Sequence, residues 1–388
     1  MGALRTDRGT RGVSLRYSSS WLRGGLALSE DLPLFDQEFL PTEPSTAAGS
    51  VDDARPDRWG ERVIRFVDKP PRLSLLEYLY FAGDDRFGAL GVSASETHYT
   101  PRTHGPLPQL GDTQAIYELV RKVLAGEPVA EAQRRLITPG ATLGGARPKA
   151  LIEQKGAAWV VKFDDGEPTD TPLVEHATMT LAARAKIRVA KTMPVPLSHG
   201  HAVAVRRFDR DKNARHHALS ANVALRAAGE AMGYPELAQL LRRRGIAKDQ
   251  VGLAHMHELY RRMVFNILID NTGDHEKNHA LLVTEAQEYA LSPAYDVLPS
   301  GQALGYQQMR VGTQSGDSTL KNALSMCALF GLKPDEARAQ NKSVAKIVAT
   351  WRAHYTAQGV SKRDIESYAE QIDRPFLAEQ RRDAIGAR

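Results

Sequence analysis

Residues 266–282, which read NILIDNTGDHEKNHALL, contain the densest group of side chains that could do chemistry. Five of them carry it: Asp274, His275, Glu276, Asn278 and His279. The two histidines and the glutamate match the H-E-x-x-H pattern, in which both histidines bind zinc and the glutamate acts as a base. The aspartate and the asparagine could instead provide a carboxylate and an amide oxygen for magnesium in phosphoryl transfer. These two chemistries require different elements around the segment.

A zinc site of this type requires a helix, because its two histidines must share one face at a spacing of four residues. The residues at 271–274 favour a turn instead, and those at 280–283 have the pattern of a strand. Glu285 and Glu288 are available as a third ligand, but both fall in the turn of a predicted hairpin. A zinc hydrolase is therefore a distant alternative, and a polar loop without chemistry is another.

The composition excludes several classes of protein. One cysteine in 388 residues rules out a framework of intrachain disulfides and fits a reducing compartment. No apolar run approaches the roughly 18 residues of a membrane helix, and the basic start lacks the apolar core of a signal peptide. The net charge of +5 comes from scattered basic residues and does not by itself indicate nucleic-acid binding. We therefore expect a cytoplasmic protein that does not enter a membrane.

The elements before this segment follow the order of a phosphotransferase. A glycine-rich stretch at 137–154 precedes a strand at 157–165 that carries Lys162. The next element is a helix at 171–187, with Thr171 as its predicted N-cap, and it carries Glu175. This order is typical of kinases, in which a glycine loop whose backbone approaches phosphates is followed by a lysine on a strand and a glutamate on a helix.

The same order continues toward the C-terminus. A strand at 201–210 is followed by mostly helical residues at 218–270 and, after the polar segment, by a hairpin at 280–291. Asp296 comes directly after this hairpin, and it could hold magnesium together with Asn278. For phosphoryl transfer, a protein must bind the phosphates, hold the metal ions and position the attacking hydroxyl. The joint order therefore predicts a two-lobed, protein-kinase-like phosphotransferase.

The N-terminal third of the sequence mixes short predicted elements. We expect strands at 63–67 and 87–93, a short helix at 74–83 and a linker at 100–112. A longer helix is expected over 113–125, where apolar residues recur at helical spacing up to a glycine.

Taken together, these residues resemble the HipA-like Ser/Thr kinases, the toxins of bacterial type II toxin–antitoxin systems. The resemblance covers nearly the whole chain. It is carried by the segments GDHEKNHALL, LSPAYDVLPS, TLGGARPKAL, VRRFDR, SWLRGGLALSEDLPL, PDRWGERV and FAGDDRFGAL.

The resemblance implies an α+β fold of the two-lobed protein-kinase-like type, with an N-terminal β-rich HipA subdomain and an all-helical C-terminal lobe. It implies a subdomain at 1–105, a kinase N-lobe with the glycine-rich loop at 106–208, and a C-lobe with the catalytic loop and the metal site at 209–388. It also implies ATP and magnesium (Mg2+) as cofactors.

Roles for single residues follow from the same resemblance. Asn278 and Asp296 would hold magnesium, and Glu175 would form a supporting ion pair with the lysine on the strand. Thr142 stands where some members autophosphorylate a loop serine, which ejects the loop and silences the enzyme. The residues expected to bind ATP are Gly144, Gly145, Lys149, Lys162, Arg206, Arg207, Phe208, His275, Lys277 and Tyr295.

Partners are implied in the same way. Family members phosphorylate proteins, in known cases an aminoacyl-tRNA synthetase, which blocks translation. They usually pair with a helix-turn-helix antitoxin that binds DNA. We therefore expect a protein substrate, an antitoxin partner, and contact with DNA only through the antitoxin.

The sequence departs from the family pattern at the catalytic base. That base should stand five residues before Asn278, which is the position of Gly273. We expect the backbone freedom of glycine to let the neighbouring Asp274 swing partly into the catalytic role. An active kinase and a catalytically weakened pseudokinase of the same fold are therefore both open. Two milder departures are Arg206 in the hinge, where an acidic residue is common, and the lack of a further opening strand.

Overall fold

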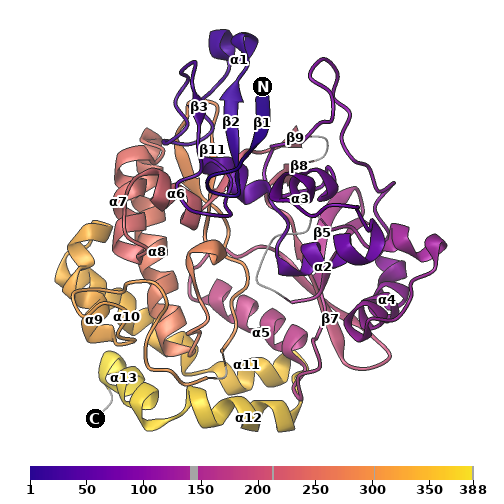
Figure 1. Cartoon of the computed structure of the whole chain (residues 1–388). Coiled ribbons are helices and arrows are strands. Elements are labelled where there is room, and N and C mark those ends of the chain that lie inside the picture. Colours follow the sequence, from indigo (N-terminus) through magenta and orange to yellow (C-terminus); the bar gives the residue numbers. More distant parts are fainter. Residues whose placement is uncertain (140–146, 212–213, 301, 387–388) are drawn as a thin grey trace. The chain divides into compact units, whose positions relative to one another are not determined.

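The computed structural model describes residues 1–139, 147–211, 214–300 and 302–386 (Figure 1). Thr142, Gly144 and Gly145 of the glycine-rich stretch lie outside these residues. The chain forms two compact units. The first unit comprises Met1–Phe163, Arg206–Gly229 and Leu282–Gln287, and the second comprises Asp164–Val205, Glu230–Leu281 and Glu288–Arg388.

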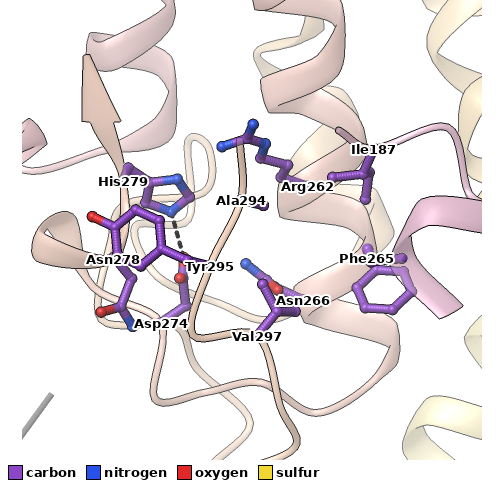
Figure 2. Close-up of a pocket in the computed structure, with 11 residues that line it drawn as sticks. Ile187, Arg262, Phe265, Asn266, Asp274, Asn278, His279, Ala294, Tyr295 and Val297 are labelled. Atoms are coloured by element: carbon purple, nitrogen blue, oxygen red, sulfur yellow. Dashed lines mark hydrogen bonds and ion pairs between the residues drawn. The ribbon is translucent and has the colours of Figure 1, made fainter. Parts of the chain in front are cut away.

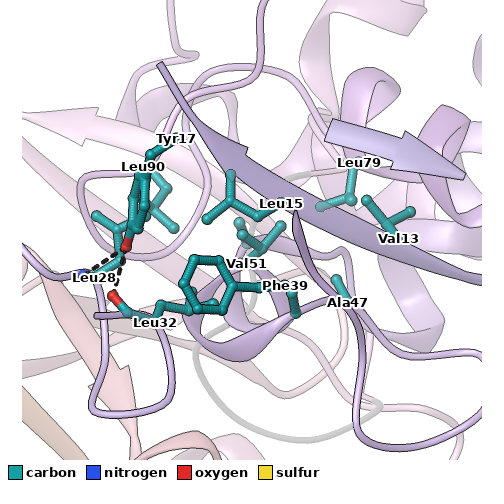
Figure 3. Close-up of a cluster of buried hydrophobic side chains, with 12 residues drawn as sticks. Val13, Leu15, Tyr17, Leu28, Leu32, Phe39, Ala47, Val51, Leu79 and Leu90 are labelled. Atoms are coloured by element: carbon teal, nitrogen blue, oxygen red, sulfur yellow. Dashed lines mark hydrogen bonds between the residues drawn. The ribbon is translucent and has the colours of Figure 1, made fainter. Parts of the chain in front are cut away.

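The first unit begins with a three-stranded antiparallel sheet in the order β1 (Gly2–Asp7), β2 (Gly12–Tyr17) and β3 (Glu38–Phe39). Its apolar side chains pack with those of the following loops into a buried core (Figure 3). Within this core the Tyr17 ring meets Phe39 edge-on at 5.8 Å, and its hydroxyl donates to the carbonyl of Leu32 at 2.8 Å. The phenol thus fixes a loop as well as filling space.

Helices rather than strands follow this sheet. They are α1 (Ser19–Gly24), η1 (Gly49–Ala54), α2 (Arg58–Val67), α3 (Leu75–Phe81), η2 (Leu110–Asp112), α4 (Thr113–Ala125) and η3 (Glu131–Leu136). The predicted helices at 74–83 and 113–125 are confirmed. A capping box of Ser74 and Glu77 starts the first, and left-handed Gly126 ends the second at φ 73°.

The two strands predicted in this region are wrong. Residues 63–67 form the end of α2, because Asp57 caps the helix and Val63, Ile64 and Val67 face the interior at helical spacing. Residues 87–93 form no strand, and Gly88 turns the chain there with φ 70°.

The remaining strands of the first unit follow the glycine-rich stretch. They are β4 (Lys149–Gln154) and β5 (Ala157–Lys162), then β8 (Arg210–Asp211), β9 (Ala214–Arg215) and β10 (Ala218–Ser220), with α6 (Ala221–Ala227) after them. The antiparallel pairing of β4 with β5 places Lys149 directly opposite Lys162. The predicted strand at 157–165 is confirmed over its first six residues.

The second unit is mostly helical. Its elements are α5 (Thr171–Arg184), β6 (Thr192–Pro196), β7 (His201–Arg206), α7 (Tyr234–Arg244), η4 (Lys248–Gln250), α8 (Val251–Leu268), η5 (Glu276–Asn278), β11 (Ala280–Val283), β12 (Tyr289–Leu291), α9 (Leu320–Ser325), η6 (Cys327–Phe330), α10 (Pro334–Val348), α11 (Trp351–Ala357), α12 (Lys362–Ile372) and α13 (Pro375–Ile385). The bounds of β7 and β11 cross into the first unit by one and two residues. The N-cap of α5 is Asp170 and not the predicted Thr171, since the Asp170 carboxylate accepts from the Leu173 amide.

The mixed helix-and-strand class is confirmed, and so is the predicted hairpin between 280 and 291. Among the described residues, no helix has the length and apolar character needed to cross a bilayer.

Candidate functional site

The candidate site begins where α8 ends. This helix is buried along most of its length, and the chain leaves it through Asp270, which adopts a left-handed φ of 62°. Few residues other than glycine take this conformation without support from their surroundings. Here an ion pair of 2.8 Å joins the Asp270 carboxylate to Arg374, and the Asn271 amide donates to the carbonyl of Asn266 at 2.9 Å. Burial raises the pKa of Asp270, although Arg374 opposes this shift.

Asp274 lies in the interior of the second unit, with its carboxylate bound by two neighbours. One carboxylate oxygen, Oδ2, accepts hydrogen bonds from the Tyr234 hydroxyl and from Nε2 of His279, the latter at 2.7 Å (Figure 2). Asn266 on α8 donates in turn to the Tyr234 hydroxyl at 3.1 Å. Burial and then the Asp274 charge raise the pKa of Tyr234 well above its ordinary value, so this phenol remains a donor. The network holds both ends of the segment 274–279.

Gly273 does not use a conformation reserved for glycine. Its φ lies outside the left-handed range. A Cβ atom built on it would lie 3.8 Å from Cβ of Ser300 and 3.9 Å from Oδ1 of Asn271, which are ordinary contact distances. The expectation that unusual backbone angles at Gly273 free Asp274 is therefore wrong. A side chain fits at position 273, and the carboxylate of Asp274 is bound elsewhere.

Asn278 carries a buried acceptor that its surroundings leave unused. Its side chain is buried, and within the part of the chain that the structure describes its Oδ1 atom has no hydrogen-bond partner. The Tyr295 hydroxyl donates to the carbonyl of Lys277 at 2.8 Å, which brings the neighbouring Asp296 toward the Asn278 segment. Asp296 itself adopts a left-handed φ of 58°, a strained conformation that concentrates at functional sites. An amide oxygen and a carboxylate fit magnesium, which prefers oxygen ligands.

A cavity of about 10 Å³ lies beneath these residues. Its polar lining residues are Arg262, Asn266, Asp274, Asn278, His279 and Tyr295, as Figure 2 shows, and apolar side chains complete the wall. This volume corresponds to a single water-sized group, so the cavity does not hold a nucleotide. The cavity lies in the protein interior, where the hydrogen bonds of the lining side chains are electrostatically stronger than in water.

The helix that a zinc site requires is not formed. Residues 276–278 make a single 3-10 turn, in which the His275 ring caps the turn by accepting from the Lys277 amide at 3.2 Å. The second histidine, His279, binds Asp274 instead. Among the residues that the structure describes, no group of three histidine, cysteine, aspartate or glutamate side chains is placed to hold a metal.

The other predicted ATP-binding residues that the structure describes lie in the first unit. Lys162 and Lys149 are both buried, and the Lys149 ammonium forms an ion pair with Asp57. Glu175, the expected partner of Lys162, is fully buried on α5 of the second unit.

Residues 206–208, which the family resemblance predicts to form the hinge beside adenine, have distinct environments. Arg206 is exposed, whereas the buried guanidinium of Arg207 binds the Asp209 carboxylate at 2.7 Å and donates to the carbonyls of Asp85 and Arg86. The burial of Asp209 works to raise its pKa, but Arg207 and Arg210 hold that pKa below its ordinary value. Phe208 packs edge-on against Phe87 at 6.3 Å. Arg207 and Phe208 therefore fix residues 206–209, the predicted hinge, through their side chains.

Sequence reasoning missed two residues of the site, Tyr234 and Asn266. A tyrosine at the start of a helix carries no distinctive signal. Asn266 did carry one, because it is a polar residue inside the apolar run VFNIL near the end of α8. A buried amide in such a run needs hydrogen-bond partners, and here these are Tyr234 and Asn271.

Comparisons with known proteins concern the family and the fold. The model of the HipA-like C-terminal domain matches residues 141–351, and that of the HipA N-terminal domain matches residues 1–93. The chain is 31% identical over 250 residues to a protein of Sinorhizobium fredii named "Putative kinase Y4dM". This match covers 59% of the chain and 56% of that relative, so it spans little more than half of the relative's length.

The fold is also similar to a solved structure, the Shewanella oneidensis MR-1 toxin–antitoxin system of HipA, HipB and operator DNA. The TM-score is 0.65 at 16% identity, and the match covers 100% of this chain and 95% of that one. At this identity the similarity concerns the fold, and it confirms the predicted kinase-like class.

Proposed function

Because this chain belongs to the HipA-like family, we propose that it is a Ser/Thr protein kinase that transfers the γ-phosphate of ATP to a protein hydroxyl. The observation that carries this proposal is the buried amide oxygen of Asn278, which has no hydrogen-bond partner among the described residues. The hydrogen bond from the Tyr295 hydroxyl to the Lys277 carbonyl ties the residue before Asp296 to the residue before Asn278.

Asn278 and Asp296 would hold magnesium in this function. The bound ion would neutralise negative charge on the transferred phosphoryl group. The chain's own residues orient these ligands: Tyr295 fixes the Asp296 segment, and the bond between Asp274 and His279 fixes the Asn278 segment. Lys162, the hinge at 206–208 and the glycine-rich loop would bind ATP. We propose three functional parts: a HipA-type N-terminal subdomain at 1–105, a kinase N-lobe at 106–208 and a helical C-lobe at 209–388.

We propose further that the protein is the toxin of a toxin–antitoxin pair. The Shewanella structure contains an antitoxin and operator DNA, which supports a helix-turn-helix antitoxin as partner and DNA contact through that antitoxin. A cytoplasmic protein such as an aminoacyl-tRNA synthetase is the proposed substrate class. The test is incubation of the purified chain with labelled ATP, magnesium and a cell lysate, followed by identification of labelled proteins. Absence of labelled protein, with ATP binding intact, would contradict kinase activity.

A pseudokinase of the same fold is the second candidate, and two observations favour it. Gly273 offers no side chain at the position of the catalytic base. The neighbouring Asp274 is buried and accepts from Tyr234 and His279, whereas a general base must reach the proton that it removes. Binding of ATP with magnesium, without transfer to any protein, would identify this second candidate.

A further inference from the structure

The C-terminal helix α13 contacts the end of α8 at two points. The guanidinium of Arg381 donates to the carbonyl of Leu268 at 3.2 Å, in the last turn of α8. Two residues further along the chain, the carboxylate of Asp270 forms an ion pair of 2.8 Å with Arg374, which is the N-cap of α13. The side chains of Asp270 and Arg374 are 1% and 15% exposed, so the pair is largely withdrawn from water. The start of the candidate site is therefore attached to α13.

Asp270 has a backbone conformation that depends on its surroundings. Its φ of 62° lies in the left-handed region, which aspartate tolerates better than most residues but which still carries a conformational cost. A residue in this conformation persists only where the surrounding structure fixes it. The ion pair holds the side chain of Asp270 from outside the loop, so the charge of Arg374 helps to keep the backbone of Asp270 in this conformation.

The carbonyl of Asp270 joins the two segments that carry the proposed metal ligands. It accepts hydrogen bonds from the Thr272 amide at 2.9 Å and from the Ser300 amide at 3.0 Å. The Ser300 hydroxyl donates to the same carbonyl at 3.2 Å, while it accepts from the Thr272 hydroxyl at 2.5 Å. Thr272 lies on the segment that leads to Asn278, and Ser300 follows Asp296 in the chain. A change in the direction of the Asp270 carbonyl would therefore shift the two segments relative to each other.

We propose that Arg374 is a positioning residue for the magnesium site, and that it acts by holding Asp270 in the conformation that aligns Asn278 with Asp296. This inference rests on the proposed function, in which these two side chains hold magnesium. Replacing a residue that orients metal ligands without touching the metal typically lowers metal affinity by about 10–100-fold. The helix α13 thereby contributes to the magnesium affinity of the site.

Calorimetric titration of the full chain with a non-hydrolysable ATP analogue tests this role, once with magnesium and once with a chelator in its place. The ratio of the two affinities measures the contribution of the metal. Arg374→Met removes the charge and keeps an unbranched chain, and Arg374→Lys keeps the charge without the planar fork. Leu377→Ala is the matched control, because it removes a fully buried side chain from the same helix and leaves the ion pair in place. Thermal unfolding of each variant is recorded alongside.

Arg374→Met should bind the magnesium–nucleotide complex about tenfold more weakly or worse, because its metal ligands are misaligned. Its affinity for the metal-free nucleotide should stay within about twofold of the wild type. Arg374→Lys should lie between the two proteins, since a point charge can still pair with the carboxylate. Leu377→Ala should unfold at a lower temperature and keep the wild-type ratio of affinities. A role in stability alone would give Arg374→Met the same ratio as Leu377→Ala.

A second substitution tests the path through Asp270. Glycine adopts the left-handed conformation without support from a side chain, so Asp270→Gly removes the need for Arg374 at this position. In the Asp270→Gly background, Arg374→Met should therefore cause no further loss of magnesium-dependent affinity. An equal loss in both backgrounds would exclude the route through Asp270 and, with it, the proposal.

The outcomes separate this inference from the function on which it rests. If magnesium raises the nucleotide affinity of the wild type and of a folded Arg374→Met variant by the same factor, the positioning role is wrong and the proposed metal site stands. If magnesium does not change the nucleotide affinity of the wild type, the proposed metal site fails and the positioning role fails with it. Arg374→Lys decides the matter should Arg374→Met not fold: an unchanged ratio of affinities contradicts the role, and a reduced ratio supports it.

Discussion

Gly273→Asp should increase phosphoryl transfer by this protein. The substitution places a carboxylate five residues before Asn278, where a kinase has its catalytic base. The backbone accepts it, because φ at Gly273 lies outside the left-handed range and the new Cβ meets only Ser300 and Asn271, at 3.8 and 3.9 Å. Asp274 retains its own partners and is not displaced.

The size of the effect follows from the role of a base. Positioned acids and bases contribute typically ~10²–10⁴-fold to a rate. At about 1.36 kcal/mol for each factor of ten, this corresponds to roughly 2.7–5.4 kcal/mol of activation free energy. The wild type should retain weak transfer, because metal ions and positioning supply much of the acceleration in phosphoryl transfer. Asp274→Ala should lower the stability of the protein, because it leaves the buried Tyr234 and His279 without their acceptor.

The assay is transfer of labelled phosphate from ATP to protein under single-turnover conditions, with ATP affinity measured alongside. Gly273→Asn is the matched control, since it has the same shape and cannot take up the proton. A folded Gly273→Asp variant that binds ATP normally but gains no activity over Gly273→Asn would refute the geometric argument. An inactive wild type with an active Gly273→Asp variant would identify the natural protein as a pseudokinase.

Three further predictions concern the metal site, the pH dependence and the loop. Asp296→Asn should weaken magnesium-dependent nucleotide binding, because a full charge beside the cation is lost, and unchanged calorimetric affinity would count against the site. The burial of Glu258 works to raise its pKa, but Arg262 and Arg188 hold that pKa below its ordinary value of 4.5. The ionised Glu258 should therefore contribute fully to stability above pH 4.5, and this contribution should disappear as the pH falls through the folded-state pKa. Chemical unfolding across this range should show that loss in the wild type and not in Glu258→Gln, which should be about 3 kcal/mol less stable at pH 7 because the buried Arg262 loses its partner. Thr142 should become phosphorylated during prolonged incubation with ATP and magnesium, adding about −1.5 to −2 charges that repel the ATP phosphates; an unmodified Thr142 by mass spectrometry, in a preparation that phosphorylates other proteins, would exclude this switch.

The sequence by itself determined the order of the parts and the elements with strong local signals. The helix at 75–81 was predictable because its capping box lies within four residues, and the helix at 113–125 because Gly126 ends it. Asn278 and Asp296 were predicted as magnesium ligands from residue type and spacing, since magnesium prefers oxygen ligands. Signals of this kind are contained within a few consecutive residues.

Local patterns failed where a distant partner decides the outcome. The run VIRFV has the β-branched composition of a strand, yet it completes a helix whose apolar face packs into the interior of the first unit. Asp274 was a candidate base on sequence position alone, and its true environment depends on Tyr234, which lies 40 residues earlier.

Only the tertiary structure decided the contacts of Pro139 and Lys149. Lys149 was expected from its position to contact ATP, and the structure pairs it with Asp57, 92 residues away in the chain. The tight contact of Gly60 with Pro139 is likewise invisible in either segment read alone. The physical reason is that packing and pairing in the interior join segments at any separation along the chain. Burial removes a charge such as that of Lys149 from water, and the charge must then pair with a partner that the fold brings near.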